Sequence, residues 1–182
     1  MKNQELCPEI QYSIQESIKT ISSIEKLIPE IQKSINAIVK CLRENKKIIL
    51  FGNGGSAADA QHIAAELIGR FKLERKGYPC IALTTDTSCL TALANDYSFD
   101  IIFSRQCETL VQKNDVVIGI STSGNSINIK KGLVIAKKKG AITIGLLGSK
   151  GGIIGKLVDI PIIVNSSSTP RIQEAHRIIY HI

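Results

Sequence analysis

The spacing of hydrophobic residues changes at about residue 46. Before that point isoleucines recur every three or four residues, from Ile10 to Ile24 and from Ile31 to Ile38, as on one face of a helix. Pro29 divides this glycine-free region into two helices. The pattern predicts a helical hairpin over residues 1–46 that packs on the rest of the chain. Because the apolar stripe is long for one small domain, part of it is alternatively an oligomer face.

From residue 47 onward, short β-branched runs alternate with helical segments. The runs predict strands at 47–51, 80–84, 116–120, 142–146 and 160–164, and helices at about 56–70, 88–96, 100–112, 126–139, 151–157 and from 170. The runs lack polar alternation, which indicates strands buried on both faces of a parallel sheet. The prediction is a three-layer α/β/α sandwich with about five parallel strands over residues 47–182, within a single domain spanning 1–182.

Composition narrows the class of protein. With 182 residues, 43% of them hydrophobic, the chain has enough apolar material for a core, which excludes global disorder. We expect no transmembrane helix, because no apolar run reaches about 18 residues. The N-terminus lacks the basic-then-apolar pattern of a signal peptide. The five cysteines are scattered, which indicates free thiols in a reducing compartment. These features together predict a cytoplasmic protein.

The formal charge of +7 raises the question of an anionic partner. Only 4% of residues are aromatic and there is no Trp, so few side chains are available for stacking on nucleic-acid bases. A small anionic substrate accounts for the charge better than nucleic acid does. A generic solvated surface remains an equal explanation for most lysines.

Two loops follow predicted strands, where ligands bind in such sheets. The first runs from Gly52 to Ser56; its glycines allow close backbone approach, and Ser56 lies near a helix N-terminus that favours anions. A structural turn with a serine cap explains this loop at least as well. The second, from Ser121 to Ser126, carries four hydroxyls in six residues, which is more than a cap needs. This second loop favours phosphate binding.

Two helical segments carry acid–base side chains. His62 and Glu66 are four residues apart and share a face of the helix after the first loop. Gln173, Arg177 and His181 repeat the same spacing on the last helix. The His–Glu pair is alternatively a surface contact or a capped core residue, and the set on the last helix is alternatively a polar outer stripe. His176 lies off that face, and we interpret it as structural or exposed.

The two loops together resemble those of the sugar isomerase (SIS) domain, a flavodoxin-like fold. The segments 61–67, 94–97 and 171–176 are similar to those of phosphoheptose isomerases, and the resemblance covers nearly the whole chain. It implies isomerisation of D-sedoheptulose 7-phosphate to D-glycero-D-manno-heptose 7-phosphate by proton transfer through an ene-diol, the first step toward ADP-heptose for lipopolysaccharide or a related surface polysaccharide. The alternatives are a non-catalytic SIS protein that binds a replication initiator or another partner, and an isomerase for another sugar phosphate.

The resemblance also implies site residues. Glu66 would be the base and His181 its acid–base partner. Substrate would be bound by Asn53, Gly54, Gly55, Ser56, Glu66, Asn95, Asp96, Ser121, Thr122, Ser123, Ser126 and Gln173.

Further implications concern metal and assembly. One zinc ion per subunit would have His62, Glu66, Gln173 and His181 as ligands, with a catalytic or an incidental role. The family is typically a homotetramer with active sites at subunit interfaces, and no nucleic acid or membrane partner is implied. The chain departs from the family pattern by ending one residue after His181. A terminal residue frays, so we expect this end to dock against a neighbouring subunit, or the chain to be a trimmed form.

Overall fold

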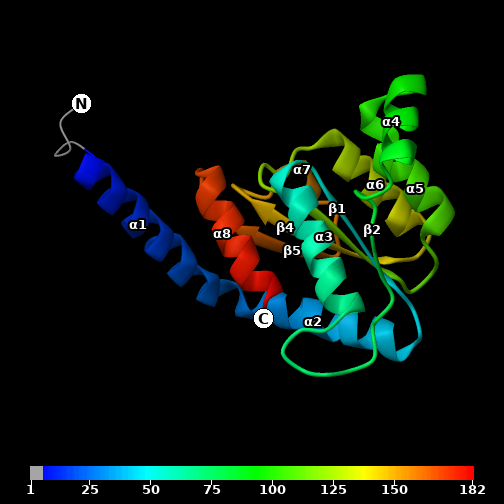
Figure 1. Ribbon diagram of the computed structural model, residues 1–182, viewed down its shortest axis with the longest axis horizontal. Helices are drawn as coiled ribbons and strands as arrows, with labels where there is room; N and C mark the ends of the chain where they lie inside the picture. The colour runs from blue at the N-terminus through cyan, green and yellow to red at the C-terminus, as the bar shows by residue number, and fades with distance from the viewer. Residues whose placement is uncertain (1–5) are drawn as a thin grey trace.

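The structure is a computed structural model that describes residues 6–182. Its centre is a sheet of five parallel strands with helices on both faces (Figure 1). The spatial order is β2-β1-β3-β4-β5, and each neighbouring pair is parallel. The predicted sandwich is confirmed. The strands are β1 (Ile48–Gly52), β2 (Cys80–Ala82), β3 (Val116–Ser121), β4 (Ile142–Gly148) and β5 (Ile160–Val164).

Successive side chains of each strand enter different cores, which explains the unbroken apolar runs. In β1, Ile48 and Leu50 belong to one buried cluster, whereas Ile49 and Phe51 belong to another. The first cluster is completed by α2 (Ile28–Arg43), α3 (Gly55–Ile68) and α8 (Thr169–Tyr180). The second is completed by α5 (Ile102–Leu110), α6 (Ile127–Lys138) and α7 (Gly152–Gly155). Both faces of the sheet are therefore dry, as a covered parallel sheet requires.

The N-terminal helices correct one detail of the prediction. α1 (Leu6–Ser22) and α2 are joined by a short 3₁₀ helix, η1 (Ser23–Leu27), and they follow one another end to end rather than folding back as a hairpin (Figure 1). The backbone stays in or near the helical region at both joints, Ser22 and Ile28, and no glycine is present to reverse it. Pro29 lies in the first turn of α2, where proline is tolerated. α1 packs on α8 at one end and projects from the body at the other.

The remaining helix, α4 (Thr87–Asp96), precedes a 3₁₀ turn, η2 (Phe99–Ile101), which leads into α5.

All five cysteines are free thiols, and burial raises the pKa of Cys80 and Cys107 to about 12. These buried thiols are therefore inert. Within residues 6–182, no helix combines the length and apolarity needed to cross a bilayer.

The order of strands fixes where a ligand binds. The chain passes from β1 to β2 on one side of β1 and then returns to β3 on the other side of β1. The direction in which successive strands are added to the sheet therefore reverses between β1 and β3. At such a switch point the loops diverge and leave a crevice beyond the carboxyl ends of the strands. The loops after β1 and β3 are the two polar loops singled out in the sequence.

Candidate functional site

The loop after β1 brings backbone close to other groups. Gly54 has a positive φ of 54°, and Ser56 is buried at the start of α3. A Cβ at Gly55 would come within 2.6 Å of the Gln173 side-chain nitrogen, so the C-terminal helix touches this loop directly. No side chain caps the N-terminus of α3, which leaves its N–H groups available to an anion.

The loop after β3 is built from its own hydroxyls. The Ser121 and Ser126 hydroxyl oxygens lie 3.1 Å apart, and Ser121 also accepts from the Gly124 N–H at 3.1 Å. The Ser126 hydroxyl does not cap α6; in the first turn of this helix the Asn128 side-chain oxygen accepts from the Ile129 N–H at 2.9 Å. The N-termini of α3 and α6, neither of which is capped by the side chain of its N-cap residue, thus follow adjacent strands. This arrangement suits a phosphate group.

The second loop depends on Gly124. Its φ is +67°, and a Cβ there would lie 2.2 Å from the Gly151 carbonyl oxygen. We expect Gly124→Ala to lower the free energy of unfolding by about 2–4 kcal/mol, because positive φ and overlap with backbone both oppose the side chain. Urea denaturation measures the loss. Gly155→Ala, whose added Cβ would meet only ordinary contacts at 3.4 Å, is the control. Equal stability of the two variants would contradict the prediction.

Asn128 joins the first loop to α6, the helix after the second loop, and was not predicted from the sequence. Its amide nitrogen donates to the Asn53 oxygen at 2.9 Å, and the Asn53 nitrogen donates back at 3.0 Å. Asn128 is buried in the first turn of α6. The Asn53 amide, which the resemblance assigned to the sugar, thus has half of its hydrogen-bonding capacity committed to Asn128 on α6. Its position one turn into a helix gave no local signal of this pairing.

The acid–base residues come together in one cluster. His62 and Glu66 from α3 meet His181 from the end of α8. The His62 Nε2 atom lies 3.2 Å from Glu66 Oε1, the His181 Nε2 atom lies 3.6 Å from the same oxygen, and the two Nε2 atoms are 3.4 Å apart. The side chains are 49%, 22% and 37% exposed, in the order His62, Glu66, His181. A ligand outside the chain therefore has access to them.

These three side chains fit a zinc ion. A tetrahedral ion about 2.0–2.1 Å from each ligand atom needs those atoms roughly 3.3 Å apart. The three separations of 3.2, 3.4 and 3.6 Å are close to that value. Two imidazoles and one carboxylate are also the donor set of catalytic zinc sites, which keep another position open.

Gln173 lies away from this cluster. Eight residues of helix place Gln173 and His181 about 12 Å apart along α8. The Gln173 amide is next to Gly55, in the first of the two polar loops. Its role as a fourth ligand stays a prediction.

His181 is held by aromatic neighbours in its own chain. It is the C-cap residue of α8, and its ring stacks on Phe71 with centroids 5.5 Å apart. The Tyr180 ring packs against it at 4.6 Å and also against His62 at 5.6 Å. Burial, and then the nearby Asp59 carboxylate, raises the pKa of Tyr180 to about 12, so its hydroxyl remains a donor at neutral pH. Docking of this end against a neighbouring subunit, expected from the sequence, stays a prediction.

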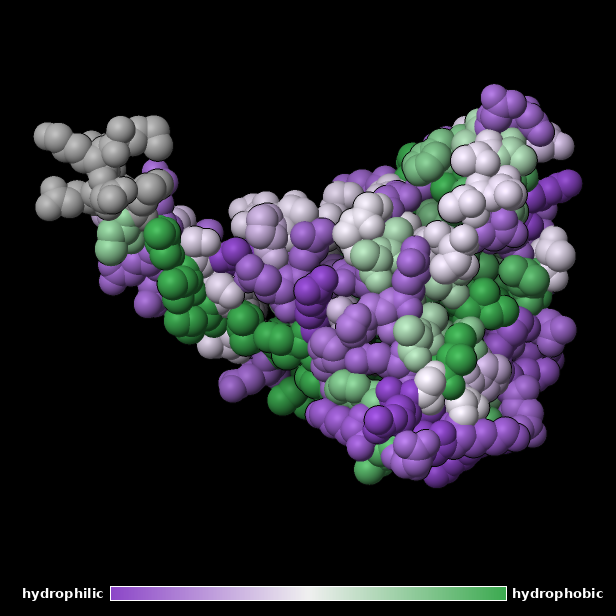
Figure 2. Space-filling model, viewed as in Figure 1, coloured by the Kyte–Doolittle hydropathy of each residue, from purple (hydrophilic) through white to green (hydrophobic). Residues whose placement is uncertain are grey.

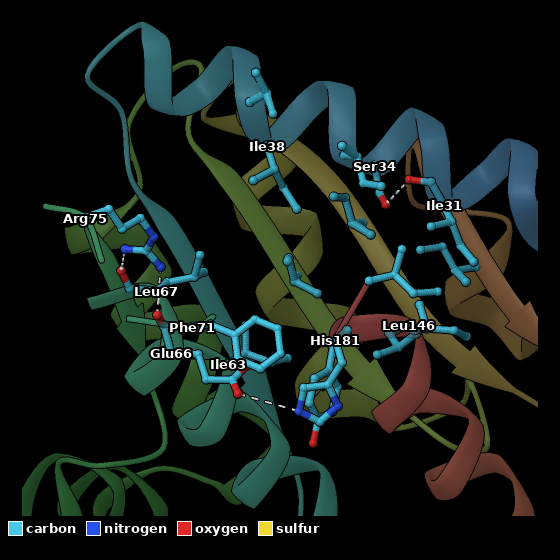
Figure 3. Close-up of a pocket in the computed structure, with 18 residues that line it drawn as sticks. Ile31, Ser34, Ile38, Ile63, Glu66, Leu67, Phe71, Arg75, Leu146 and His181 are labelled. Atoms are coloured by element: carbon cyan, nitrogen blue, oxygen red, sulfur yellow. Dashed lines mark hydrogen bonds and ion pairs between the residues drawn. The ribbon is translucent and has the colours of Figure 1, made fainter. Parts of the chain in front are cut away.

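Arg75 supports the helix that carries Glu66. Its guanidinium donates to the carbonyl oxygens of Glu66 and Leu67 at 2.8 and 2.9 Å, at the end of α3 (Figure 3). These carbonyls have no partners further along the helix, so a cation there stabilises the helix end. The arrangement fixes the last turn of α3, which presents Glu66 to His181.

Two predicted residues lie elsewhere. Asn95 and Asp96 are exposed at the end of α4, where the Asn95 amide donates to the Asp96 carboxylate at 2.8 Å. Within residues 6–182 no hydrogen bond joins either side chain to the two loops or to the cluster. Their contact with a sugar stays a prediction.

His176 is fully buried, so the interpretation as structural holds and exposure is excluded. Its Nε2–H donates to the Leu147 carbonyl at 3.1 Å, and burial lowers its pKa. It ties α8 to β4 as a neutral ring.

A groove of about 350 Å³ opens behind the cluster, between α2, α3, α8 and the sheet (Figure 3). Hydrophobic side chains line most of it, with Glu66 and His181 at one end. Neither polar loop lines this groove. Because sugar hydroxyls need hydrogen-bond partners, the polar groups of the two loops suit a sugar better than this groove does.

Comparisons with known proteins show the family of the chain. Residues 12–148 match the SIS domain family. A phosphoheptose isomerase from Geotalea daltonii is 54% identical over 175 residues, covering 96% of this chain and 91% of that protein. One from Nitratiruptor sp. is 55% identical over 174 residues, covering 95% and 93%. The chain belongs to the phosphoheptose isomerase family of SIS-domain proteins.

Solved structures of the family agree with the fold. The phosphoheptose isomerase from Neisseria gonorrhoeae has a TM-score of 0.92 at 40% identity, over 97% of this chain and 95% of that one. The enzyme from Francisella tularensis has a TM-score of 0.89 at 34% identity, over 100% and 95%. The match to these structures therefore includes α1, which projects from the body, and α8, which ends at His181.

Proposed function

We propose that the protein is an aldose–ketose isomerase that converts D-sedoheptulose 7-phosphate to D-glycero-D-manno-heptose 7-phosphate. The observation that carries the proposal is the convergence of His62, Glu66 and His181 in a chain whose two polar loops lead into α3 and α6, neither helix being capped by its N-cap side chain. The choice of substrate is supported by the relatives at 54–55% identity, which are named phosphoheptose isomerase. A non-catalytic SIS protein needs no such acid–base cluster, which disfavours that alternative.

The two loops would bind the phosphate. Ser56, Ser121, Thr122, Ser123 and Ser126 offer hydroxyls or N–H groups at the starts of α3 and α6. These donors hold an anion without a lysine or arginine, because N–H dipoles at both helix ends point toward it. Binding at C7 would leave the C1–C2 end of the sugar free to reach the cluster. Asn53, Gly54, Gly55, Asn95, Asp96 and Gln173 would contact the hydroxyls between.

The reaction needs one base and one proton donor near C1 and C2. Glu66 would take a proton from C1 while His181 gives one to the C2 oxygen, which forms the ene-diol. Glu66 would then return a proton to C2, and His181 would take one from the C1 hydroxyl, leaving the C1 aldehyde. Both protons are recovered, so the two residues finish as they began.

Zinc is part of the proposal. His62, Glu66 and His181 would hold the ion, with Gln173 as the candidate fourth ligand. A bound zinc ion would polarise the substrate carbonyl as a Lewis acid. Ligation of Glu66 or His181 would compete with its use as a proton carrier, so the catalytic and the incidental roles lead to opposite responses to a chelator.

The direct test is turnover. Purified protein is incubated with sedoheptulose 7-phosphate, with added zinc and with a chelator, and aldose formation is followed. Turnover that rises with zinc supports a catalytic metal, and turnover that survives the chelator supports an incidental one. No turnover by folded protein would overturn the proposal in favour of a binding protein. Faster turnover of a five- or six-carbon ketose phosphate would indicate another sugar.

We also propose a homotetramer with active sites at subunit interfaces. Figure 2 shows a continuous hydrophobic stripe along the projecting α1. On it Ile10, Ile14 and Ile18 are 58%, 53% and 52% exposed at helical spacing. Burial of such a stripe in a helical bundle would stabilise an assembly by about 1.5–3 kcal/mol per side chain.

Ile14→Glu is expected to dissociate the assembly, because the charge would lose its water within an apolar interface. Light scattering measures the mass. Lys19→Glu, a charge change on the opposite side of α1, is the control. A wild-type protein of monomer mass would contradict the proposed tetramer and the interface sites.

The proposed product would enter ADP-heptose synthesis for lipopolysaccharide or a related surface polysaccharide. A cytoplasmic location fits the free thiols.

A further inference from the structure

Asp59 is a buried carboxylate outside the cluster. It lies on α3, three residues before His62, and is 3% exposed. Its Oδ1 atom accepts from the Tyr180 hydroxyl at 3.3 Å and lies 3.5 Å from Arg177 Nε. Both partners are on the last turn of α8, so one carboxylate connects α3 to α8, the two helices that supply the histidines.

Tyr180 carries this connection to the cluster. Its hydroxyl is fixed by Asp59, and its ring contacts His181 at 4.6 Å and His62 at 5.6 Å between centroids. The His181 ring is edge-on to His62, with centroids 5.4 Å apart and planes at 87°. A change in the angle of the Tyr180 ring would therefore change the positions of both imidazoles.

Helix attachment alone accounts poorly for Asp59. Burying a charge costs desolvation free energy, and only close partners offset that cost well. Here the partners are a neutral hydroxyl and an arginine whose side chain is 67% exposed. Asp115 gives the contrast: its carboxylate meets Lys47 Nζ at 2.7 Å and accepts from the Gln112 N–H at 2.8 Å, at the other end of the sheet. Asp115 therefore has the close charged and backbone partners that hold a buried carboxylate in the fold, whereas Asp59 has fewer and more distant ones.

We propose that Asp59 and Tyr180 are positioning residues that orient His62 and His181 for the reaction. The proposal rests on the proposed function for its catalytic consequence, whereas the orientation itself is a property of the chain alone. Outer partners of metal-binding histidines fix ring orientation, and their loss typically costs 10–100-fold in metal affinity or activity.

The test uses the histidine ring signals of ¹⁵N-labelled protein. The chain has three histidines, and buried His176 serves as an internal reference. Tyr180→Phe removes only the hydroxyl, and Asp59→Asn only the charge. The controls are Tyr12→Phe, a hydroxyl loss on exposed α1, and Asp115→Asn, a loss of buried charge far from the cluster. Zinc affinity by chelator competition and kcat against KM are measured on the same variants.

Tyr180→Phe is expected to move the His62 and His181 signals while His176 stays in place, to weaken zinc about tenfold, and to lower kcat more than it raises KM. Asp115→Asn is expected to lower thermal stability and leave both signals unmoved. Unmoved signals in Tyr180→Phe, or equal shifts in Asp115→Asn, would overturn the proposal. A wild-type protein without turnover would overturn the proposed function, and the ring signals would still decide the positioning role.

Discussion

Glu66→Gln is expected to lower kcat for isomerisation by about 10²–10⁴-fold, the usual contribution of a positioned acid or base. Glu66 is the one carboxylate of the three-residue cluster in the described part of the chain. Glutamine keeps the shape of the side chain and has no basic oxygen for the C1 proton. The rate of aldose formation measures the loss, and exchange of the C1 proton with deuterated water measures proton removal itself.

The control is Glu74→Gln, which alters an 84% exposed side chain paired with Arg70. Its kcat is expected to equal that of the wild type, because surface ion pairs contribute little. Since Glu66 is also a candidate zinc ligand, zinc content is measured alongside. A Glu66→Gln protein that retains more than a tenth of the wild-type rate would remove Glu66 from the proton transfers.

The sheet was predictable because its signal is local. Runs such as 116–120 are apolar at every position, and only a strand covered on both faces requires this. The end-to-end path of α1 and α2 was not predictable from the same kind of pattern. Hydrophobic spacing identifies the buried face of each helix, whereas the angle at Ser22 and Ile28 depends on backbone torsions that nearly all residues adopt.

The candidate site was predictable where short-range rules apply. Parallel strands place Ser56 and Ser121 at one edge, and helical spacing places His62 and Glu66 on one face. The contacts that complete the site join residues far apart in sequence: Asn53 with Asn128, and Asp59 with Tyr180. A single sequence taken alone gives no sign of such pairs.

His181→Ala is expected to reduce kcat by about 10²–10⁴-fold while leaving the fold intact. The ring is 37% exposed and follows the last turn of α8, so its removal leaves little cavity in the core. The loss is chemical: without the imidazole, no group on α8 protonates the C2 oxygen as the C1 proton leaves. Exchange of the C1 proton should therefore fall together with isomerisation. Circular dichroism and thermal unfolding check the fold.

The control for His181→Ala is Ile182→Ala, which shortens the next side chain, itself 69% exposed. Equal losses in both variants would mean that the end of the chain matters for packing and that the imidazole has no chemical role. A selective loss in His181→Ala, with zinc affinity also reduced, would leave two explanations, proton transfer and metal binding. Chelator treatment separates them. If the imidazole acts in proton transfer, His181→Ala remains slower than the wild-type protein after the metal has been removed from both.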